Sequence, residues 1–441
     1  MKFIALFFFL IVLAFDVYPQ KAGEVLATAA GLSFTPDSLS ENGRKIFNDQ
    51  KATLANARSE ILSQMLADML LEAEAKSRNI SVETLVETKV KKIPVPSAAD
   101  IKAVYDANRA ALGDKTLEEA KKEIVEYLLR EPEQKALQSL IDSLKIKHKF
   151  ALGKDVNAAN LNPMESLGGI NGRSLAVQEF EAKNKGTLYD IQAEIADEIK
   201  ADLENSIFST LLAAEAKSRS MEAGDVYAAE ITNKMREFSD EEKAGLQTAF
   251  KKTLFAKFNV KILLKEPVPF VQDISADDDP SQGKAAAPVT IIMFTDFQCP
   301  ACSATHPVLK KVVSEYGDNV RFVIRDFPLT NIHENALAAA RAANAANLQG
   351  KFFEFIDILY RNQTMLDTDS LKKYAAGLGL NVKQFEIDLS SEKIAAEVGK
   401  DMADGKKYGI GGTPAIFVNG VKVRRLSAQA FRDAVDKALK K

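Results

Sequence analysis

The stretch FTDFQCPAC, residues 294–302, contains both cysteines of the 441-residue chain, Cys299 and Cys302. An apolar run precedes it and helical spacing follows, so we expect a strand that leads through a loop into a helix. A helix N-terminus carries partial positive charge and unpaired N–H groups, which favour a thiolate. A lowered thiol pKa makes the sulfur a better-populated nucleophile and a better leaving group. The pair is therefore predicted to be redox-active.

Length and composition limit the classes of protein to consider. A chain of 441 residues is long enough for two to four domains. Apolar residues at 46% and charged residues at 27% are typical of a globular protein. The formal net charge of −3 lacks the basic surplus of nucleic-acid-binding proteins, so no nucleic-acid partner is expected.

The N-terminus has the pattern of a secretory signal. Met1 and Lys2 are followed by thirteen apolar residues, Phe3 to Phe15, and then by polar residues. The apolar run is short for a membrane-spanning helix, which needs about 20 residues. We expect residues 1–22 to be a signal peptide or leader and the protein to be periplasmic or otherwise exported. The alternative is an uncleaved N-terminal membrane anchor.

Export decides how the cysteines are interpreted. In an oxidising compartment a C-x-x-C pair is a disulfide or a dithiol in turnover, whereas zinc competes in the cytosol. A structural zinc site needs four ligands. His148, His306 and His333 are the only histidines, and they lack the paired spacing of such a site. Neither a metal nor another cofactor is expected.

An internal repeat occupies the region before the cysteines. AEAKSR at residues 73–78 recurs at 214–219, and at the same offset of 141 residues AAGLS at 29–33 falls on INGRS at 170–174. Between these matches, apolar positions of helical period also correspond. The alternative is a coincidence of helical composition in a chain rich in alanine, glutamate and lysine.

The repeat predicts two mostly α-helical modules, residues 25–152 and 166–265. Each begins with a short strand or turn around its glycine and continues into a long helix. In the first module we also expect a helix over 117–143, interrupted near Glu131 and Pro132, and a strand over 144–150, where apolar and polar residues alternate.

These modules resemble the N-terminal region of SurA-like and related parvulin-type foldases. AAGLSFTPDSL (29–39), INGRSLAVQEFE (170–181), the repeated AEAKSR and SAADIKAVYDANR (97–109) carry the resemblance. It implies a helical module that binds unfolded chains as a chaperone. The alternative is a structural spacer or dimerisation arm. No stretch resembles a parvulin catalytic domain, so prolyl isomerase activity is not carried over.

Residues 266–288 are predicted to be a linker, because proline, glycine and an acidic run interrupt any periodicity there. Asp277–Asp279 lack the spaced ligands and the terminal glutamate of a calcium loop. We therefore expect these acids to belong to a solvated connector.

The C-terminal third, residues 289–441, predicts alternating strands and helices. The expected elements are a strand at 289–296, the cysteine helix, a strand at 320–325, a helical segment at 334–408, a strand entered through GIGGTPAIFVNG (409–420), its partner at 421–426 and a final helix at 428–441.

This order resembles the thioredoxin superfamily and specifically DsbA-like proteins, in which a helical insert splits the thioredoxin core. FTDFQCPAC and GIGGTPAIFVNG carry the resemblance. It implies an α/β thioredoxin-like domain in which Cys299 is the exposed attacking thiol and Cys302 the buried resolving thiol. It further implies a cis Pro414 opposite the pair, with the Thr413 backbone offered to an extended substrate strand.

Asp296, three residues before Cys299, is a candidate proton acceptor for the resolving thiol, as buried acids are in this superfamily. The alternative is a solvated loop acid.

Together these features predict an exported thiol–disulfide oxidoreductase that exchanges disulfides with folding proteins, while its helical modules hold the client. Its expected partners are unfolded or folding exported proteins and a membrane or soluble redox partner that recycles the cysteines. Oxidase, reductase and isomerase directions all fit the pair. The alternative is a chaperone or scaffold in which the thioredoxin-like domain binds partners with little redox turnover.

Overall fold

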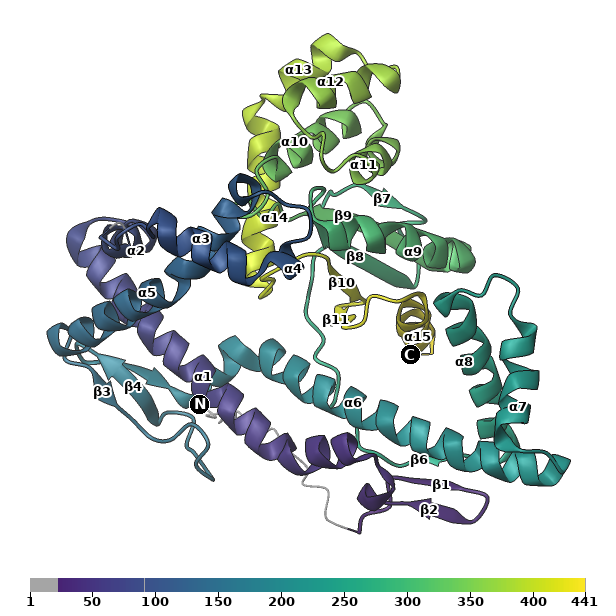
Figure 1. The fold of residues 1–441 in the computed structure, drawn as a ribbon. Helices are drawn as coiled ribbons and strands as arrows, with labels where there is room; N and C mark the ends of the chain where they lie inside the picture. Colours follow the sequence, from purple (N-terminus) through teal and green to yellow (C-terminus); the bar gives the residue numbers. More distant parts are fainter. Residues whose placement is uncertain (1–22, 91, 441) are drawn as a thin grey trace, which may run out of the picture. The chain divides into compact units, whose positions relative to one another are not determined.

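The computed structural model describes residues 23–90 and 92–440. The chain divides into two compact units, the first ending at Lys265 and the second spanning Glu266–Lys441 (Figure 1). The predicted leader, residues 1–22, lies outside the described residues. Over the residues that are described, no helix is both long enough and apolar enough to cross a membrane.

The first unit is mainly helical. Its helices are α1 (Glu41–Arg78), α2 (Val82–Val90), α3 (Ala98–Ala107), α4 (Arg109–Leu112), α5 (Leu117–Lys147), α6 (Val177–Arg219), α7 (Ala223–Glu230) and α8 (Asp240–Lys257), with short 3-10 turns η1 (Pro36–Ser38) and η2 (Thr232–Lys234). Its strands are β1 (Ala27–Ala29), β2 (Leu32–Phe34), β3 (Ala151–Leu152), β4 (Ser166–Ile170), β5 (Arg173–Ala176) and β6 (Lys261–Ile262).

The long helices α1 and α6 run side by side in opposite directions (Figure 1). Phe47, near the start of α1, shares a hydrophobic core with Leu203 and Ile207 in the second half of α6. Leu70, near the end of α1, shares another core with Phe180 at the start of α6. Apolar residues at helical spacing along both helices therefore form two hydrophobic cores, one toward each end of the pair.

The small sheets of the first unit exchange strands between the two predicted modules. The β1–β2 hairpin pairs with β6, so Ala27 lies opposite Ile262. Conversely, the β4–β5 hairpin pairs with β3, so Gly169 lies opposite Ala151. Each hairpin thus completes its sheet with the last strand of the other module.

Residues that share the offset of 141 have nearly the same backbone conformation. Ala30 and Asn171 both have φ 48°, and both donate a backbone hydrogen bond to the turn after a long helix, at Phe258 and His148 respectively. The glycines that follow, Gly31 and Gly172, both have φ 83°, a conformation that glycine adopts without steric cost.

Two expectations for this unit are corrected by the structure. Residues 25–152 and 166–265 are not separate domains, because each hydrophobic core takes side chains from both ranges. The helix after residue 117 is not interrupted, and α5 continues through Pro132 to Lys147. Leu140 and Leu144 are buried one turn apart on its inner face, so the alternation at 144–150 belongs mostly to the helix end.

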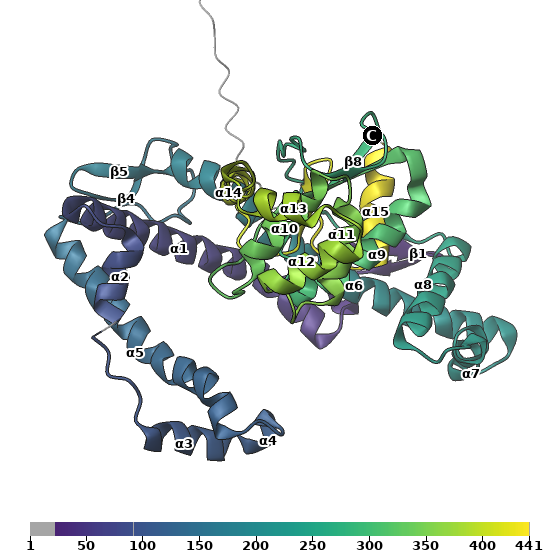
Figure 2. The same ribbon diagram turned by 90° about the horizontal axis from the view of Figure 1, so that it is seen from above.

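The first module carries helices that the second lacks. Helix α3 packs against the start of α5, and Ile101, Tyr105, Ala120 and Ile124 form a small core between them. Figure 2 shows α3 and α4 at the end of α5 that points away from α1. This extension explains why the first repeat is the longer one.

The second unit is an α/β fold. Its strands are β7 (Ser281–Gln282), β8 (Val289–Thr295), β9 (Val320–Asp326), β10 (Ala415–Val418) and β11 (Val421–Lys422). Its helices are α9 (Pro300–Tyr316), α10 (Ala336–Asn347), α11 (Phe352–Arg361), α12 (Thr368–Gly377), α13 (Val382–Leu389), α14 (Glu392–Lys407) and α15 (Ala428–Leu439), with the 3-10 turn η3 (Gly317–Asn319).

The strands form one sheet in the order β11-β10-β8-β9-β7, in which only β8 and β9 are parallel. Helix α9 connects β8 to β9, and helices α10–α14 form an insert between β9 and β10. Alternate residues of β8 enter two cores on opposite faces of the sheet, with Met293 on one face and Phe294 on the other. The predicted α/β class with a helical insert is confirmed for this unit.

The interpretation of residues 266–288 as a linker needs correction. The segment belongs to the second compact unit, and its strand β7 pairs with β9 at the sheet edge. Asp279 is 8% exposed and contacts the buried Arg325, so it is not a solvated residue. The acidic run has the composition of a connector, and the cationic partner that buries Asp279, Arg325, is distant in the sequence.

Candidate active site

The cysteines lie where β8 leads into α9. Cys299 is the N-cap residue of α9, Pro300 is its first helical residue, and Cys302 lies in its first turn. Proline suits this position because the first helical N–H has no intrahelical acceptor. Cys299 is 7% exposed and Cys302 is fully buried, and both thiols are free in this structure. Both cysteines are thus buried, so the exposed position that the resemblance implied for Cys299 is not found, although Cys302 is the more deeply buried of the two. The attacking and resolving roles stay predictions.

The environment of Cys299 stabilises its thiolate. Its pKa is lowered from 9.0 to about 5, first because the Cys302 thiol donates a hydrogen bond to it. The backbone N–H groups of Ala301 and Cys302 and the side chain of Thr413 act in the same direction, while burial opposes them. At neutral pH Cys299 is therefore a thiolate at a helix N-terminus.

The environment of Cys302 does the opposite. Burial raises the pKa of its thiol, and the hydrogen bond to Cys299 raises it further. Hydrogen bonds from the Asp296 backbone and the Thr295 side chain only partly offset these effects. Cys302 is therefore a thiol when Cys299 is a thiolate.

The turn before β10 faces the cysteine pair. The Thr413–Pro414 peptide bond is cis, as the resemblance implied. Cys299 Sγ lies 3.4 Å from the Thr413 carbonyl oxygen, which accepts a hydrogen bond from the thiol only when the thiol is protonated. The structure therefore brings together Cys299, Cys302, Thr413 and Pro414 from two motifs that are far apart in the sequence.

Asp296 is buried in the loop between β8 and α9, so the alternative of a solvated loop acid does not hold. One carboxylate oxygen accepts a hydrogen bond from the Gln298 N–H at 2.7 Å. The other contacts the Leu329 N–H at 2.8 Å and His333 Nδ1 at 2.7 Å. These contacts tie the carboxylate to the loop after β9, while the backbone of Asp296 contacts Cys302. Its role as proton acceptor stays a prediction.

Two residues of the helical insert that the sequence analysis did not single out also hold the site. Gln363 Nε2 donates to the Phe297 carbonyl at 3.0 Å and to the Cys299 carbonyl at 2.8 Å. The Tyr360 hydroxyl forms a 2.6 Å hydrogen bond with Thr295 Oγ1. No local pattern marks Gln363 or Tyr360, because their partners lie more than sixty residues earlier.

His306, one turn beyond Cys302, neither contacts the thiols nor faces solvent. Its ring packs on Tyr360 with a centroid distance of 4.8 Å, and the residue is 2% exposed. Burial lowers its pKa from 6.5 to about 4, so the ring is neutral at physiological pH.

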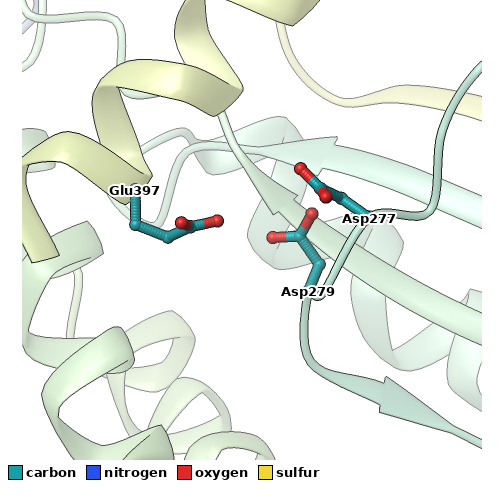
Figure 3. A group of neighbouring side chains, drawn as sticks. All are labelled: Asp277, Asp279 and Glu397. Carbon is teal, nitrogen blue, oxygen red and sulfur yellow. The ribbon is translucent and has the colours of Figure 1, made fainter. Parts of the chain in front are cut away.

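An acidic cluster lies elsewhere in this unit. Figure 3 shows Asp277 and Asp279 opposite Glu397 of α14, and carboxylate oxygens of the three residues lie within 4.8 Å of one another. Burial raises the pKa of Asp279 to about 9. Arg325 contacts Asp279 at 2.9 Å and Lys400 forms an ion pair with Asp277. Because Arg325 and Lys400 occupy Asp279 and Asp277, and burial keeps Asp279 protonated near neutral pH, we assign no metal to the cluster.

Comparison with known proteins agrees with the fold of the second unit. A family profile described as "Thioredoxin" matches residues 275–437. The second unit is therefore a thioredoxin-like domain.

Curated relatives match a limited part of the chain. A Na(+)/H(+) antiporter NhaA 1 of Mycolicibacterium vanbaalenii is 33% identical over 174 residues, which is 38% of this chain and 28% of the relative. An antiporter NhaA 3 of Salinispora tropica is 36% identical over 147 residues, covering 33% of this chain and 22% of the relative. The chain thus spans about a quarter of the length of the curated relatives it matches.

Solved structures are similar over a comparable share of the chain. A thioredoxin-like oxidoreductase from Silicibacter pomeroyi is 30% identical with a TM-score of 0.34, covering 37% of this chain and 94% of that protein. Oxidised BdbD from Bacillus subtilis is 25% identical with a TM-score of 0.35, covering 39% of this chain and 99% of that protein.

Proposed function

We propose that this protein is a thiol–disulfide oxidoreductase that exchanges disulfides with other polypeptides through a mixed disulfide at Cys299. The observation that carries the proposal is the opposite tuning of the two thiols. The pKa of Cys299 is lowered to about 5, while burial raises the pKa of Cys302. A thiolate beside a protonated thiol is the arrangement that attacks or releases one sulfur and then resolves the mixed disulfide with the other.

The Thr413–Pro414 turn is the proposed docking point for the client backbone. A client segment that adds as an extended strand can hydrogen-bond to the Thr413 backbone. Since the Thr413 carbonyl lies 3.4 Å from Cys299 Sγ, such a strand would bring its own sulfur within reach of that atom.

The proposed direction of disulfide exchange follows from the stabilisation of the Cys299 thiolate. Stabilising the Cys299 thiolate lowers the free energy of the dithiol form relative to the disulfide form, which favours giving a disulfide to clients. We therefore propose that the pair acts as an oxidant when a redox partner keeps it oxidised. Equilibration with glutathione buffers measures the reduction potential, and a potential near that of cytosolic thioredoxin would contradict this direction.

The first unit is proposed to bind client polypeptide. Its residue correspondences at the offset of 141 and its exchanged strands support a duplication of a helical module. That these modules are of the SurA-like kind is part of the proposal. Both cysteines lie in the second unit, so the first contributes no thiol to the reaction. Covalent linkage of a binding region to the thiols raises the effective concentration of the client.

Export completes the proposal, since the pair can cycle through its disulfide form only where oxidant is available. Fractionation of cells, followed by acid quenching and thiol alkylation, would give both the location and the redox state of the pair. A fully reduced pair in the cytoplasm would contradict this part of the proposal.

The exchange reaction is tested with two cysteine variants of the full chain. Cys299→Ser is expected to abolish insulin reduction and client oxidation, because it removes the attacking sulfur. Cys302→Ser is expected to accumulate mixed disulfides at Cys299 that a non-reducing gel resolves. Suppression of client aggregation that survives Cys299→Ser, with no turnover in the wild type, would favour the binding-module alternative.

The thiolate itself is tested by alkylation. The rate at which iodoacetamide modifies Cys299 in the reduced protein is expected to rise with pH around a midpoint of about 5. Cys302→Ala serves as a control, because it removes the hydrogen bond that the Cys302 thiol donates to Cys299 and should move the midpoint upward. A midpoint above pH 8 in the wild type would contradict the proposed site.

A further inference from the structure

The end of helix α11 contacts the cysteine loop on both sides of the redox pair. Before the pair, the Tyr360 hydroxyl forms a 2.6 Å hydrogen bond with Thr295 Oγ1. After the pair, Ser303 Oγ donates a hydrogen bond to the Tyr360 carbonyl oxygen at 2.8 Å. The rings of Phe297 and Tyr360 pack with their centroids 5.3 Å apart, and both residues are buried. The helical insert therefore gives the loop a well-packed support.

Between these contacts, Gln363 reaches the loop with its side-chain amide. Its Nε2 lies 3.0 Å from the Phe297 carbonyl oxygen and 2.8 Å from the Cys299 carbonyl oxygen. Both partners are acceptors, so the nitrogen of the amide faces them, and its two N–H groups can serve one carbonyl each. The two carbonyls belong to the planar peptide groups that precede Gln298 and follow Cys299. One side chain thus fixes the orientation of both peptide planes at the entrance to α9.

The bend of the backbone at Cys299 decides which groups its sulfur meets. Cys299 is the N-cap residue of α9 and has an extended backbone, with φ −74° and ψ 121°, directly before the helical residues. Its carbonyl accepts the first hydrogen bond of the helix, from the Ser303 N–H at 3.2 Å. The N–H groups of Ala301 and Cys302 lie beside the sulfur, where they stabilise the thiolate. Gln363 is a second donor to the same Cys299 carbonyl, so it holds this geometry in place.

The titratable groups around the loop are separate from this contact. Cys302 lies on α9 itself, and Tyr360 of α11 is bonded to Thr295. Asp296, in the loop before α9, contacts His333 of the loop after β9 at 2.7 Å. Gln363 has no ionisable group, so replacing it with another neutral residue adds or removes no charge at the site.

We propose that Gln363 is a positioning residue that holds Cys299 at the N-cap of α9 and thereby sets the stability of its thiolate and the oxidising strength of the pair. This inference rests on the proposed exchange function. Gln363 contacts backbone carbonyls of the loop, 64 residues away from Cys299 along the chain, and acts on the sulfur through them. The helical insert thus controls the redox properties of cysteines that belong to the thioredoxin-like core.

Gln363→Met tests the inference in the full-length protein, because methionine has a similar length and cannot donate a hydrogen bond. The pH midpoint of Cys299 alkylation by iodoacetamide is expected to rise by about one unit, the effect of weakening a charge-assisted hydrogen bond to the thiolate. One unit corresponds to about tenfold in an equilibrium constant. The equilibrium with reduced and oxidised glutathione at pH 7 should therefore move about tenfold toward the disulfide form of the protein, because the dithiol form has lost that stabilisation.

Asn362→Ala is the matched control. The Asn362 side-chain amide donates to the Ile358 carbonyl at 2.8 Å, so it stabilises the end of α11 and not the cysteine loop. This variant is expected to keep the wild-type midpoint and the wild-type glutathione equilibrium. A shift of the same size in both variants would show that a loosened helix end is the cause, which would overturn the inference. Wild-type values of both quantities in folded Gln363→Met would overturn it as well.

Gln363→Lys keeps the inference testable if the methionine variant does not fold. An ammonium group can donate to both carbonyls and brings a positive charge toward the loop, so the midpoint is expected at or below the wild-type value. A midpoint above the wild-type value in folded Gln363→Lys would contradict the inference. The alkylation midpoint is measured without any exchange reaction. Failure of the wild-type protein to exchange its disulfide with glutathione would therefore contradict the proposed function and is a distinguishable result.

Discussion

In the first unit a buried carboxylate is surrounded by basic side chains, whereas in the second unit a buried guanidinium is surrounded by carboxylates. Glu74, whose side chain has no exposed surface, contacts Arg78, Lys147 and His148. Its counterpart in the repeat, Glu215, has Arg219 and Lys257. Hydrogen bonds from Lys147 are the main cause that lowers the pKa of Glu74 from 4.5 to about 2.

Arg325 forms the opposite arrangement. Its side chain is fully buried and contacts Asp279, Asp401 and Asp404. One cation cannot neutralise several desolvated acids, so burial raises the pKa of Asp279 to about 9 and that of Asp401 in the same direction. Surplus cations thus keep an acid ionised and structural, while surplus acids retain protons near neutral pH.

The largest expected effect is that of Arg325→Met. Removing the cation leaves the fully buried Asp401 without its counter-charge and takes the guanidinium away from Asp279 and Asp404, which is expected to destabilise the second unit by about 3–5 kcal/mol at pH 7. Urea unfolding followed by circular dichroism measures the loss. The loss should shrink near pH 4, where protonation replaces the missing charge. Equal destabilisation at both pH values would show that packing, not charge, is what Arg325 supplies.

Glu74→Gln tests the other arrangement and is expected to cost the first unit about 1–3 kcal/mol at pH 7, because charge-assisted hydrogen bonds are lost. The folded pKa of Glu74 lies below its ordinary value, so its contribution is complete above about pH 4.5 and disappears as the pH falls toward about 2. Wild type and variant should therefore converge in acid. Glu215→Gln is the matched control, expected to behave alike, and a variant that loses no stability at pH 7 would break the comparison.

His148→Phe is expected to have a smaller effect, a loss of about 1 kcal/mol. His148 Nε2 lies 2.9 Å from Glu74 Oε2, and its Nδ1 lies 3.0 Å from Asn171. Phe258 occupies the corresponding place after α8, so the substitution copies one half of the first unit into the other. Thermal unfolding of His148→Phe and of Phe258→His measures the change in stability at these two corresponding positions. A loss above 3 kcal/mol would show that the two places are not equivalent.

The smallest expected change is that of Asp279→Asn, within about 1 kcal/mol at pH 6, because asparagine resembles the neutral carboxyl group in shape and charge. The folded pKa of about 9 lies above the ordinary 3.8, so this acid makes the wild-type second unit less stable as the pH rises between these values. In the Asp279→Asn variant, the part of the pH dependence of the unfolding free energy that Asp279 causes should be absent. Unfolding free energies at pH 5, 7 and 9 check it, and an unchanged slope would contradict the assignment.

Local sequence signals were sufficient where the chemistry is local. Cys299, Pro300 and Cys302 follow a strand directly, so their place at a helix start could be predicted from spacing and polarity. The resemblance placed Thr413–Pro414 opposite them, because it supplied the long-range pairing that no local pattern contains. The thioredoxin-like class of the second unit follows from these two motifs together.

Local sequence patterns failed to predict the structure where the contacting residue is distant in the sequence. Asp277–Asp279 have the composition of a solvated loop, and only Arg325 on β9 makes Asp279 a buried residue. Gln363 and Tyr360 lie on or beside an ordinary amphipathic helix, and their contacts with the cysteine loop cannot be inferred from its period. The strand exchange in the first unit was missed for the same reason, since a hairpin sequence specifies its turn but not its third strand.

That exchange has a consequence for synthesis on the ribosome. Ala27 pairs with Ile262, so the first hairpin to emerge must wait for almost the whole unit before its sheet can be completed. At ~5–20 residues per second this interval lasts roughly ten seconds or more, far longer than a hairpin needs to form. The nascent chain therefore carries a strand edge without its hydrogen-bonding partner while most of the first unit is translated. Protection of that edge from pairing with other chains is then a condition for a high yield of folded protein.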